Sequence, residues 1–252
     1  MPTADQRENL RQRPPGAPVM FQAWRHVLFL HWAWDPAAIQ ATLPRGLHVD
    51  TFDGQAWLGV VPFWMDAVRP RFCPPVPGLS WFLELNLRTY VHDDQGRPGV
   101  WFYSLDCNQP IAVRIARSRF HLPYVHARQT ATRPNGTHPA TYASLRRDRS
   151  ARPDHSTFTY NAAGPVFKAT PGTLEFFLAE RYLLFSHDPR RDHIHTGRVW
   201  HPPYPLQPAR VDQAETTLFA ANGFPAPGRP HDHALYSPGI NVSIYPLQLA
   251  GA

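Results

Sequence analysis

Lysine is nearly absent from this chain of 252 residues, because Lys168 is the only lysine among 25 basic residues. The net charge of +6 is therefore carried almost wholly by arginine. A nucleic-acid surface needs basic residues clustered along one face, whereas these arginines are scattered through the sequence. The sequence therefore does not predict a DNA or RNA partner.

Cysteine is also scarce, and no long apolar run is present. Cys73 and Cys107 lie far apart, so neither a disulfide framework nor a cysteine metal site is expected. No apolar segment approaches the ~20 residues of a membrane-spanning helix. Residues 1–18 are polar and lack the apolar core of a secretory signal. We expect a soluble cytoplasmic protein with no membrane partner, and residues 1–18 as a mobile arm.

Nucleotide and nucleophile motifs are missing as well. The chain has no Gly-rich phosphate loop and no dinucleotide fingerprint, so no cofactor is expected. Residues 78–82 lack the second glycine of a Gly-x-Ser-x-Gly nucleophile elbow. Cys107 precedes a predicted helix start, but a small buried cysteine is the favoured interpretation.

Proline and aromatic residues are abundant. The 29 prolines, against only three methionines, predict many turns and few long helices, and the predicted strands make the fold mainly β. The 13% aromatic content excludes a disordered chain. Residues 19–252 contain no second-domain linker and are expected to form one domain. Asp35-Pro36 is typical of a helix start, and Asp53-Gly54 between apolar runs predicts a hairpin of residues 49–52 with 55–65.

The clearest predicted strand spans residues 81–91. Its odd positions are almost wholly apolar, whereas the even positions include Glu84, Asn86 and Arg88. Alternate residues of a strand share a face, so Glu84 and Arg88 lie on the same side. In a barrel, that polar side could line a cavity. Residues 69–79 contain four prolines and are predicted to be a loop over its mouth.

Two short histidine pairs, His193/His195 and His231/His233, are candidate metal ligands. Each pair would face one way on a strand, but a zinc or iron site usually takes at least three ligands from separate elements. Both pairs lie in segments dense with Pro, Gly, Arg and Asp, so solvated loop histidines are the favoured interpretation. No metal is predicted.

Polar residues on predicted strands and helices are better candidates for a pocket. Each one alone is more often structural, as a paired group or a charge that reaches solvent. Together they would suit an organic anion, because the planar arginine side chain binds carboxylates well. The candidates are Glu84, Arg88, Arg117, Tyr124, Arg181 and His201.

Several segments in a fixed order resemble the YqjF-like family of uncharacterised bacterial proteins, along nearly the whole chain. This resemblance implies an acetoacetate decarboxylase-like antiparallel β-barrel with a few short helices. The segments are residues 87–91, 99–106, 116–117, 122–124, 180–182, 201–206 and 236–239.

The more distant similarity to acetoacetate decarboxylases bears on mechanism. Those enzymes carry Gly-Arg-Glu, four further residues and then Pro-Lys, and the lysine forms a Schiff base. Here Ala116-Arg117-Ser118 is followed at that spacing by Pro123-Tyr124. Since a phenol cannot form an imine, the resemblance implies that lysine-dependent decarboxylation is absent. Lys168 is not expected to substitute.

Three functions remain open from the sequence. The first is binding of a small, anionic organic molecule in the barrel, without Schiff-base chemistry. The second is a lyase, isomerase or hydrolase that uses Tyr124 as acid or base, assisted by Glu84 or His201. The third is a protein-interaction module, favoured if the barrel interior is filled by side chains. A monomer or a homodimer is expected.

Overall fold

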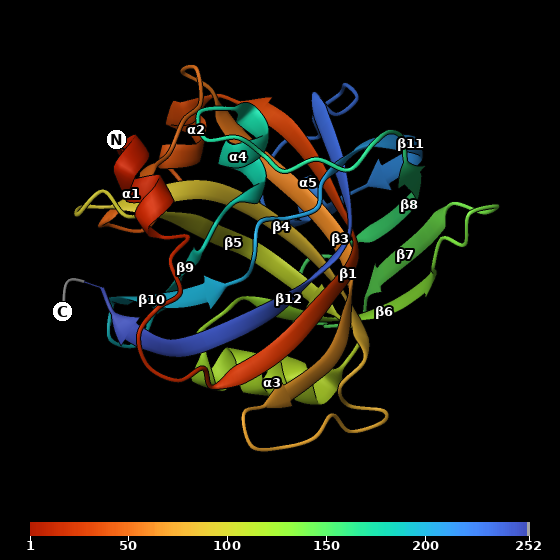
Figure 1. The fold of residues 1–252 in the computed structure, drawn as a ribbon, viewed down its shortest axis with the longest axis horizontal. Helices are drawn as coiled ribbons and strands as arrows, with labels where there is room; N and C mark the ends of the chain where they lie inside the picture. The colour runs from red at the N-terminus through yellow and green to blue at the C-terminus, as the bar shows by residue number, and fades with distance from the viewer. Residues whose placement is uncertain (251–252) are drawn as a thin grey trace.

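Five neighbouring antiparallel strands form the middle of the fold in the computed structural model, which describes residues 1–250 (Figure 1). Each pairs with the next in a continuous sheet. They are, in spatial order, β12 (His233–Leu249), β1 (Met20–Trp34), β3 (Ala56–Pro70), β4 (Phe82–Asp93) and β5 (Pro98–Cys107).

Two sets of outer strands close this sheet into two rings that share the five central strands. In the first ring, β9 (Leu183–Asp188) runs parallel to β5, and β10 (His193–Trp200) joins β9 to β12. The second ring runs from β5 through four strands back to β12. These are β6 (Tyr124–Thr132), β7 (Ala140–Arg146), β8 (His155–Ala162) and β11 (Gln207–Thr216).

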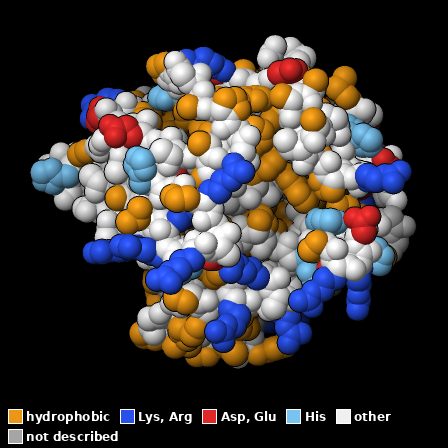
Figure 2. All heavy atoms as spheres, turned by 180° about the vertical axis from the view of Figure 1, so that it is seen from behind, with side chains coloured by type: hydrophobic (Ala, Val, Ile, Leu, Met, Phe, Trp, Pro, Cys, Tyr) orange, Lys and Arg blue, Asp and Glu red, His pale blue; other side chains and the backbone are white. Residues whose placement is uncertain are grey.

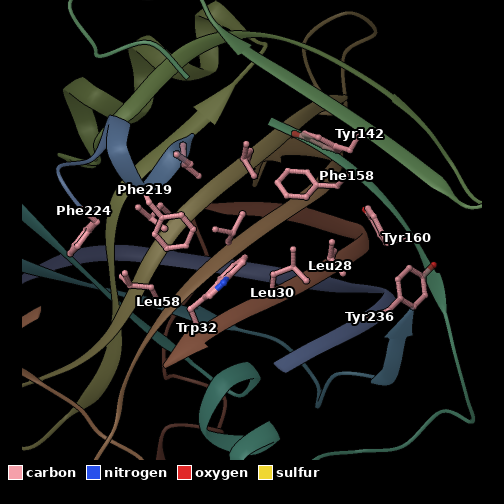
Figure 3. Close-up of a cluster of buried hydrophobic side chains, with 14 of the residues drawn as sticks. Leu28, Leu30, Trp32, Leu58, Tyr142, Phe158, Tyr160, Phe219, Phe224 and Tyr236 are labelled. Atoms are coloured by element: carbon pink, nitrogen blue, oxygen red, sulfur yellow. The ribbon is translucent and has the colours of Figure 1, made fainter. Parts of the chain in front are cut away.

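The shared strands bury both faces, which explains the nearly continuous apolar run of β1. Leu28, Leu30 and Trp32 point into the second ring, where Figure 3 shows them packed among aromatic side chains. Val27 and Phe29 belong to a different buried cluster inside the first ring. The mainly β fold predicted from composition and periodicity is thus confirmed.

Short helices cover the ends of the rings, as the prolines predicted. The predicted start at Asp35-Pro36 is confirmed, because the Asp35 side chain caps α2 (Pro36–Gln40) at 3.0 Å from the amide of Ala37. The other short helices are α3 (Pro110–Arg119), α4 (Leu174–Ala179) and α5 (Leu218–Ala221).

The hairpin predicted around Asp53-Gly54 is only partly correct. Both turn residues have positive φ, and Phe52 and Gln55 form a bridge across them. The preceding strand, β2 (Leu47–Val49), pairs with β4 rather than with β3. Between β2 and this bridge, the amide of Asp50 donates to the carbonyl oxygen of Tyr90 on β4 at 2.9 Å, and Arg7 and Arg181 hold its buried carboxylate.

Residues 1–18 contain a helix, α1 (Ala4–Asn9), that makes specific contacts with the rest of the chain. Thr3 and Gln6 form a capping box at its start. Arg7 makes two hydrogen bonds of 2.7 Å to Asp50, and Arg198 donates to the carbonyl oxygen of Leu10. These contacts argue for a docked arm; its mobility and the single-domain organisation of residues 19–252 stay predictions.

Gly99 lets β5 approach β9 closely enough to close the first ring. A Cβ at this position would lie 2.7 Å from both the carbonyl oxygen of Leu183 and the ring of Phe185. We therefore expect Gly99→Ala to lower the free energy of unfolding by about 1–3 kcal/mol, the usual cost of overpacking. Thermal unfolding would measure this as a lower Tm. An unchanged Tm would mean that β5 and β9 separate at no cost.

Candidate functional site

The first ring encloses a cavity of about 430 Å³. Every strand of the ring contributes to its wall, and most of the lining is apolar. The loop between β3 and β4 and the helix α3 surround its mouth, as the proline content of residues 69–79 suggested. Apolar lining residues include Val27, Phe29, Val61, Phe63, Phe82, Phe102, Val199 and Ile244.

One strip of polar side chains interrupts this apolar wall. Glu84, Asn86 and Arg88 occupy alternate positions of β4 and all face the cavity, while Leu83, Leu85 and Leu87 pack in the second ring. Alternation along a strand requires this separation. Asn86 was not singled out from the sequence, although the same period of two identifies it.

Glu84 is the centre of a hydrogen-bond group within the strip. The hydroxyl of Tyr124 donates to Glu84 Oε2 at 2.7 Å, and Asn86 Nδ2 donates to Oε1 at 3.1 Å. Burial raises the pKa of Glu84 from 4.5 to about 7, and the two donors only partly oppose this rise. A carboxyl group with this pKa can accept or release a proton near neutral pH.

Tyr124 is fixed as a donor rather than a base. Burial and the neighbouring charge of Glu84 raise the pKa of Tyr124 well above 10. Its phenol therefore stays protonated, which assigns the titrating role in this pair to Glu84. Burial also raises the pKa of the Cys107 thiol far above its usual value, so Cys107 is not activated.

Arg88 is a buried cation for which no carboxylate partner lies within ion-pair distance in the described chain. Its Nη2 donates to the carbonyl oxygen of Leu178 at 3.1 Å and to the hydroxyl of Tyr90 at 3.3 Å. Its Nε has no hydrogen-bond partner among residues 1–250. The guanidinium lies over the ring of Phe29, 5.4 Å from the centroid. A buried cation of this kind favours an anion beside it.

Arg181 also lines the cavity, but unlike Arg88 it has a carboxylate partner. Nη1 of Arg181 lies 2.8 Å from Asp50 Oδ2, and Asp50 also binds Arg7. The Arg7–Asp50–Arg181 group was not foreseen from the sequence, because Asp50 and Arg181 lie 131 positions apart. Asp50 holds Arg181 at the wall, while Nη2 of Arg181 has no hydrogen-bond partner among residues 1–250.

Arg117 and His201 lie outside the cavity, unlike the expectation from the sequence. Arg117 is exposed and donates to the carbonyl oxygen of Tyr124 and to Asp148, which hold it against the outside of β6. His201 is buried, stacks on Tyr182 and donates to the carbonyl oxygen of Pro202. Burial lowers the pKa of His201 to about 4, so the ring is neutral and structural.

The lysine and the histidine pairs are also separate from the strip. Lys168 is exposed in the segment after β8 and does not line the cavity. His195 stacks on His121, whereas His233 faces Glu175 at 3.6 Å. Within residues 1–250, no group of three or more His, Cys, Asp or Glu side chains is placed to hold a metal ion.

Several solved structures with the same fold are enzymes, and some of them are acetoacetate decarboxylases or enzymes like them. MppR, an enduracididine biosynthesis enzyme complexed with pyruvate, has a TM-score of 0.61 and 13% identity over 94% of this chain and 93% of its own. An acetoacetate decarboxylase-like enzyme from Sphingomonas wittichii has a TM-score of 0.59 and 14% identity over 93% and 94%. Acetoacetate decarboxylase from Legionella pneumophila has a TM-score of 0.56 and 12% identity over 94% and 88%. At these identities the likeness establishes an acetoacetate decarboxylase-like fold alone.

Sequence comparison assigns the chain to a particular family within this fold. The family DUF2071, described as an uncharacterized conserved protein, matches residues 21–241. The uncharacterized protein YqjF of Bacillus subtilis is 36% identical over 214 residues, which are 85% of this chain and 86% of that protein. The chain therefore belongs to the DUF2071 family, and the resemblance to YqjF-like proteins is confirmed.

The raised pKa of Glu84 predicts how stability changes with pH. Below pH 4.5, Glu84 is protonated in both the folded and the unfolded protein. Between pH 4.5 and about 7 it ionises only in the unfolded protein, which favours unfolding. The stability that protonated Glu84 contributes is therefore lost as the pH rises through this range. Glu84→Gln cannot ionise and should be more stable than the wild type above pH 7, by on the order of 2–3 kcal/mol. Thermal unfolding from about pH 5 to about pH 8 measures the difference.

Glu215→Gln provides the matched control, because Glu215 is exposed on β11. Its Tm should follow that of the wild type at every pH. A constant difference between Glu84→Gln and the wild type across this range would contradict the raised pKa of Glu84.

Proposed function

We propose that the protein binds a small organic molecule with an apolar body and one anionic group in the cavity of the first ring, without forming a Schiff base. The observation that carries this proposal is the buried Arg88 guanidinium, which faces the cavity without a carboxylate partner in the described chain. A ligand carboxylate would supply the missing counter-charge and can accept two hydrogen bonds from one guanidinium.

The shape of the cavity supports the apolar part of this ligand. A volume of about 430 Å³ lies in the usual range for small-molecule sites, and a few polar groups in an apolar wall are the common pattern. An interior with this much free space also weighs against the interaction-module hypothesis, which was favoured if side chains filled the ring.

The position of lysine supports binding without a Schiff base. An imine needs a lysine amine beside the ligand carbonyl. The single lysine, Lys168, is exposed and away from the cavity wall, and Tyr124 contributes a phenol to that wall. The pyruvate complex of MppR, a protein with the same fold, supports oxo acids as one ligand class to test.

Replacement of Arg88 by methionine should remove binding of carboxylates. We expect thermal shift or calorimetry to detect binding of short- and medium-chain monocarboxylates to the wild type. Arg88→Met should weaken this binding at least about tenfold, because a charged hydrogen bond contributes ~1.5–3 kcal/mol. Primary alcohols of the same carbon number provide neutral ligands, whose binding should change little.

Arg133→Met is the matched control for the lost charge, because Arg133 is exposed and pairs with Asp66 outside the cavity. The proposed function would be overturned if carboxylates bound with equal affinity to Arg88→Met, Arg133→Met and the wild type. A folded Arg88→Met protein, shown by an unchanged circular dichroism spectrum, is required for the comparison.

A second candidate function is proton transfer next to a carbonyl group, with Glu84 as the acid or base. The pKa of Glu84 near 7 favours it, because general acid–base catalysis works best near the working pH. The sequence assigned this role to Tyr124; we propose Tyr124 as the donor that positions Glu84 instead. The expected reaction class is an isomerase or lyase without covalent catalysis.

Exchange of carbon-bound hydrogen in D₂O tests this second function. A panel of 2-oxo and 4-oxo monocarboxylates would be followed by proton NMR, and Glu84→Gln should lower any exchange about 10²–10⁴-fold. Tyr124→Phe removes a hydrogen bond that lowers the pKa of Glu84, so the rise of rate with pH should move to higher pH. Exchange that persists in Glu84→Gln would exclude Glu84 as the base.

A further inference from the structure

The mouth of the cavity is surrounded by an exposed apolar surface. Val76 and Leu79 in the loop between β3 and β4, and Ile111 and Ile115 on α3, line the cavity and are still 41–53% exposed. Phe72 in the same loop is 88% exposed. Gln109 donates to the carbonyl oxygen of Gly78 at 2.7 Å and thereby connects the helix start to the loop. We call residues 71–81 and α3 together the mouth surface.

Apolar exposure is concentrated on this surface. Of the eleven large hydrophobic residues that are exposed among the described residues, six belong to it. Figure 1 places α3 and the loop at the same end of the molecule, and Figure 2 shows hydrophobic side chains gathered at that end with arginine or lysine beside them. The six are Phe72, Val76, Leu79, Trp81, Ile111 and Ile115.

The two segments that form the mouth surface carry charge of one sign, and the carboxylate of Asp148 reaches them from another segment. Residues 67–83 and 107–123 contain no aspartate or glutamate. Arg117 is paired with Asp148, whereas the other arginines of these segments make no ion pair in the described part of the chain. These four are Arg69, Arg71, Arg114 and Arg119.

From this combination we infer that the mouth surface docks on an anionic lipid bilayer, so that the cavity opens toward the membrane. Exposed aromatic and aliphatic side chains enter the interface, and nearby arginines attract anionic headgroups. A second copy of the chain is a poorer occupant, since a two-fold contact of this surface would bring its own arginines together. The inferred association is peripheral. No helix in residues 1–250 is long and apolar enough to span a membrane.

If the mouth surface docks on a bilayer, the bilayer would also be the source of the ligand. This part of the inference rests on the proposed function. An amphiphilic carboxylate leaving the bilayer would pass Val76, Leu79 and Ile111 with its apolar body and reach Arg88 inside. The docking itself depends only on the surface residues. Sequence patterns did not predict this surface, because its apolar residues lie in two segments that β4 and β5 separate along the chain and never form a long run.

Flotation of the full chain with vesicles tests the inference without any ligand. We expect binding to phosphatidylcholine vesicles that contain phosphatidylglycerol, little binding to phosphatidylcholine alone, and weaker binding at high salt. Phe72→Ser/Trp81→Ser should reduce the bound fraction strongly, because both side chains are exposed and neither lines the cavity. Arg71→Gln/Arg114→Gln should weaken binding about tenfold or more.

Control residues lie outside the mouth surface, on other elements. Val166→Ser removes an exposed apolar residue of the segment after β8, and Arg210→Gln removes an exposed charge of β11; both should bind vesicles like the wild type. Three results would overturn the inference. They are equal vesicle binding by the mouth and control variants, no vesicle binding by the wild type, and a wild-type dimer that dissociates in Phe72→Ser/Trp81→Ser.

The two proposals fail separately in this design. Soluble carboxylate binding by Phe72→Ser/Trp81→Ser should match the wild type, because Arg88 and the cavity wall are untouched. Lost vesicle binding with retained carboxylate binding supports docking. Vesicle binding by a wild type that binds no carboxylate overturns the proposed function and leaves the docking intact.

Discussion

The burial of both faces of β4 is the constraint on which the rest of the site depends. Two rings share this strand, so water can solvate neither of its faces freely. The leucines at odd positions fill the second ring, and the polar side chains at even positions must therefore enter the first. Glu84 meets this constraint with a pKa raised to about 7 by burial and with a hydrogen bond donated by Tyr124, whereas Arg88 relies on the Leu178 carbonyl oxygen and two aromatic rings.

Burial of a polar strip costs free energy, so a fold that served only stability would fill the first ring with apolar side chains. The cavity instead keeps about 430 Å³ open beside a cation and a titrating acid. Function is the simplest reason for the retention of such a strip, since the groups that a ligand would use are the ones that destabilise the empty protein.

Local patterns predicted the parts of this site that lie on one strand. The period of two along residues 81–91 placed Glu84 and Arg88 on one face, and proline content placed a loop at the mouth. The same reasoning could not predict that Arg117 lies outside the cavity or that Arg181 forms an ion pair at its wall, because the position of an arginine side chain depends on its partner. Asp148 holds Arg117 outside, and Asp50 pairs with Arg181; both pairs form only when distant segments meet. The Asp53-Gly54 turn likewise formed, but β4 competed for the strand before it.

The charges of Arg88 and Glu84 would link binding of the proposed ligand to pH. An anion bound at Arg88 would add negative charge to the wall that Glu84 shares and so disfavour the ionised form of Glu84. By linkage, ionisation of Glu84 above its pKa would disfavour the anion in turn. Uptake of the proposed anionic ligand and uptake of a proton by Glu84 would thus reinforce each other. A site built for a neutral ligand would need neither Arg88 nor this coupling.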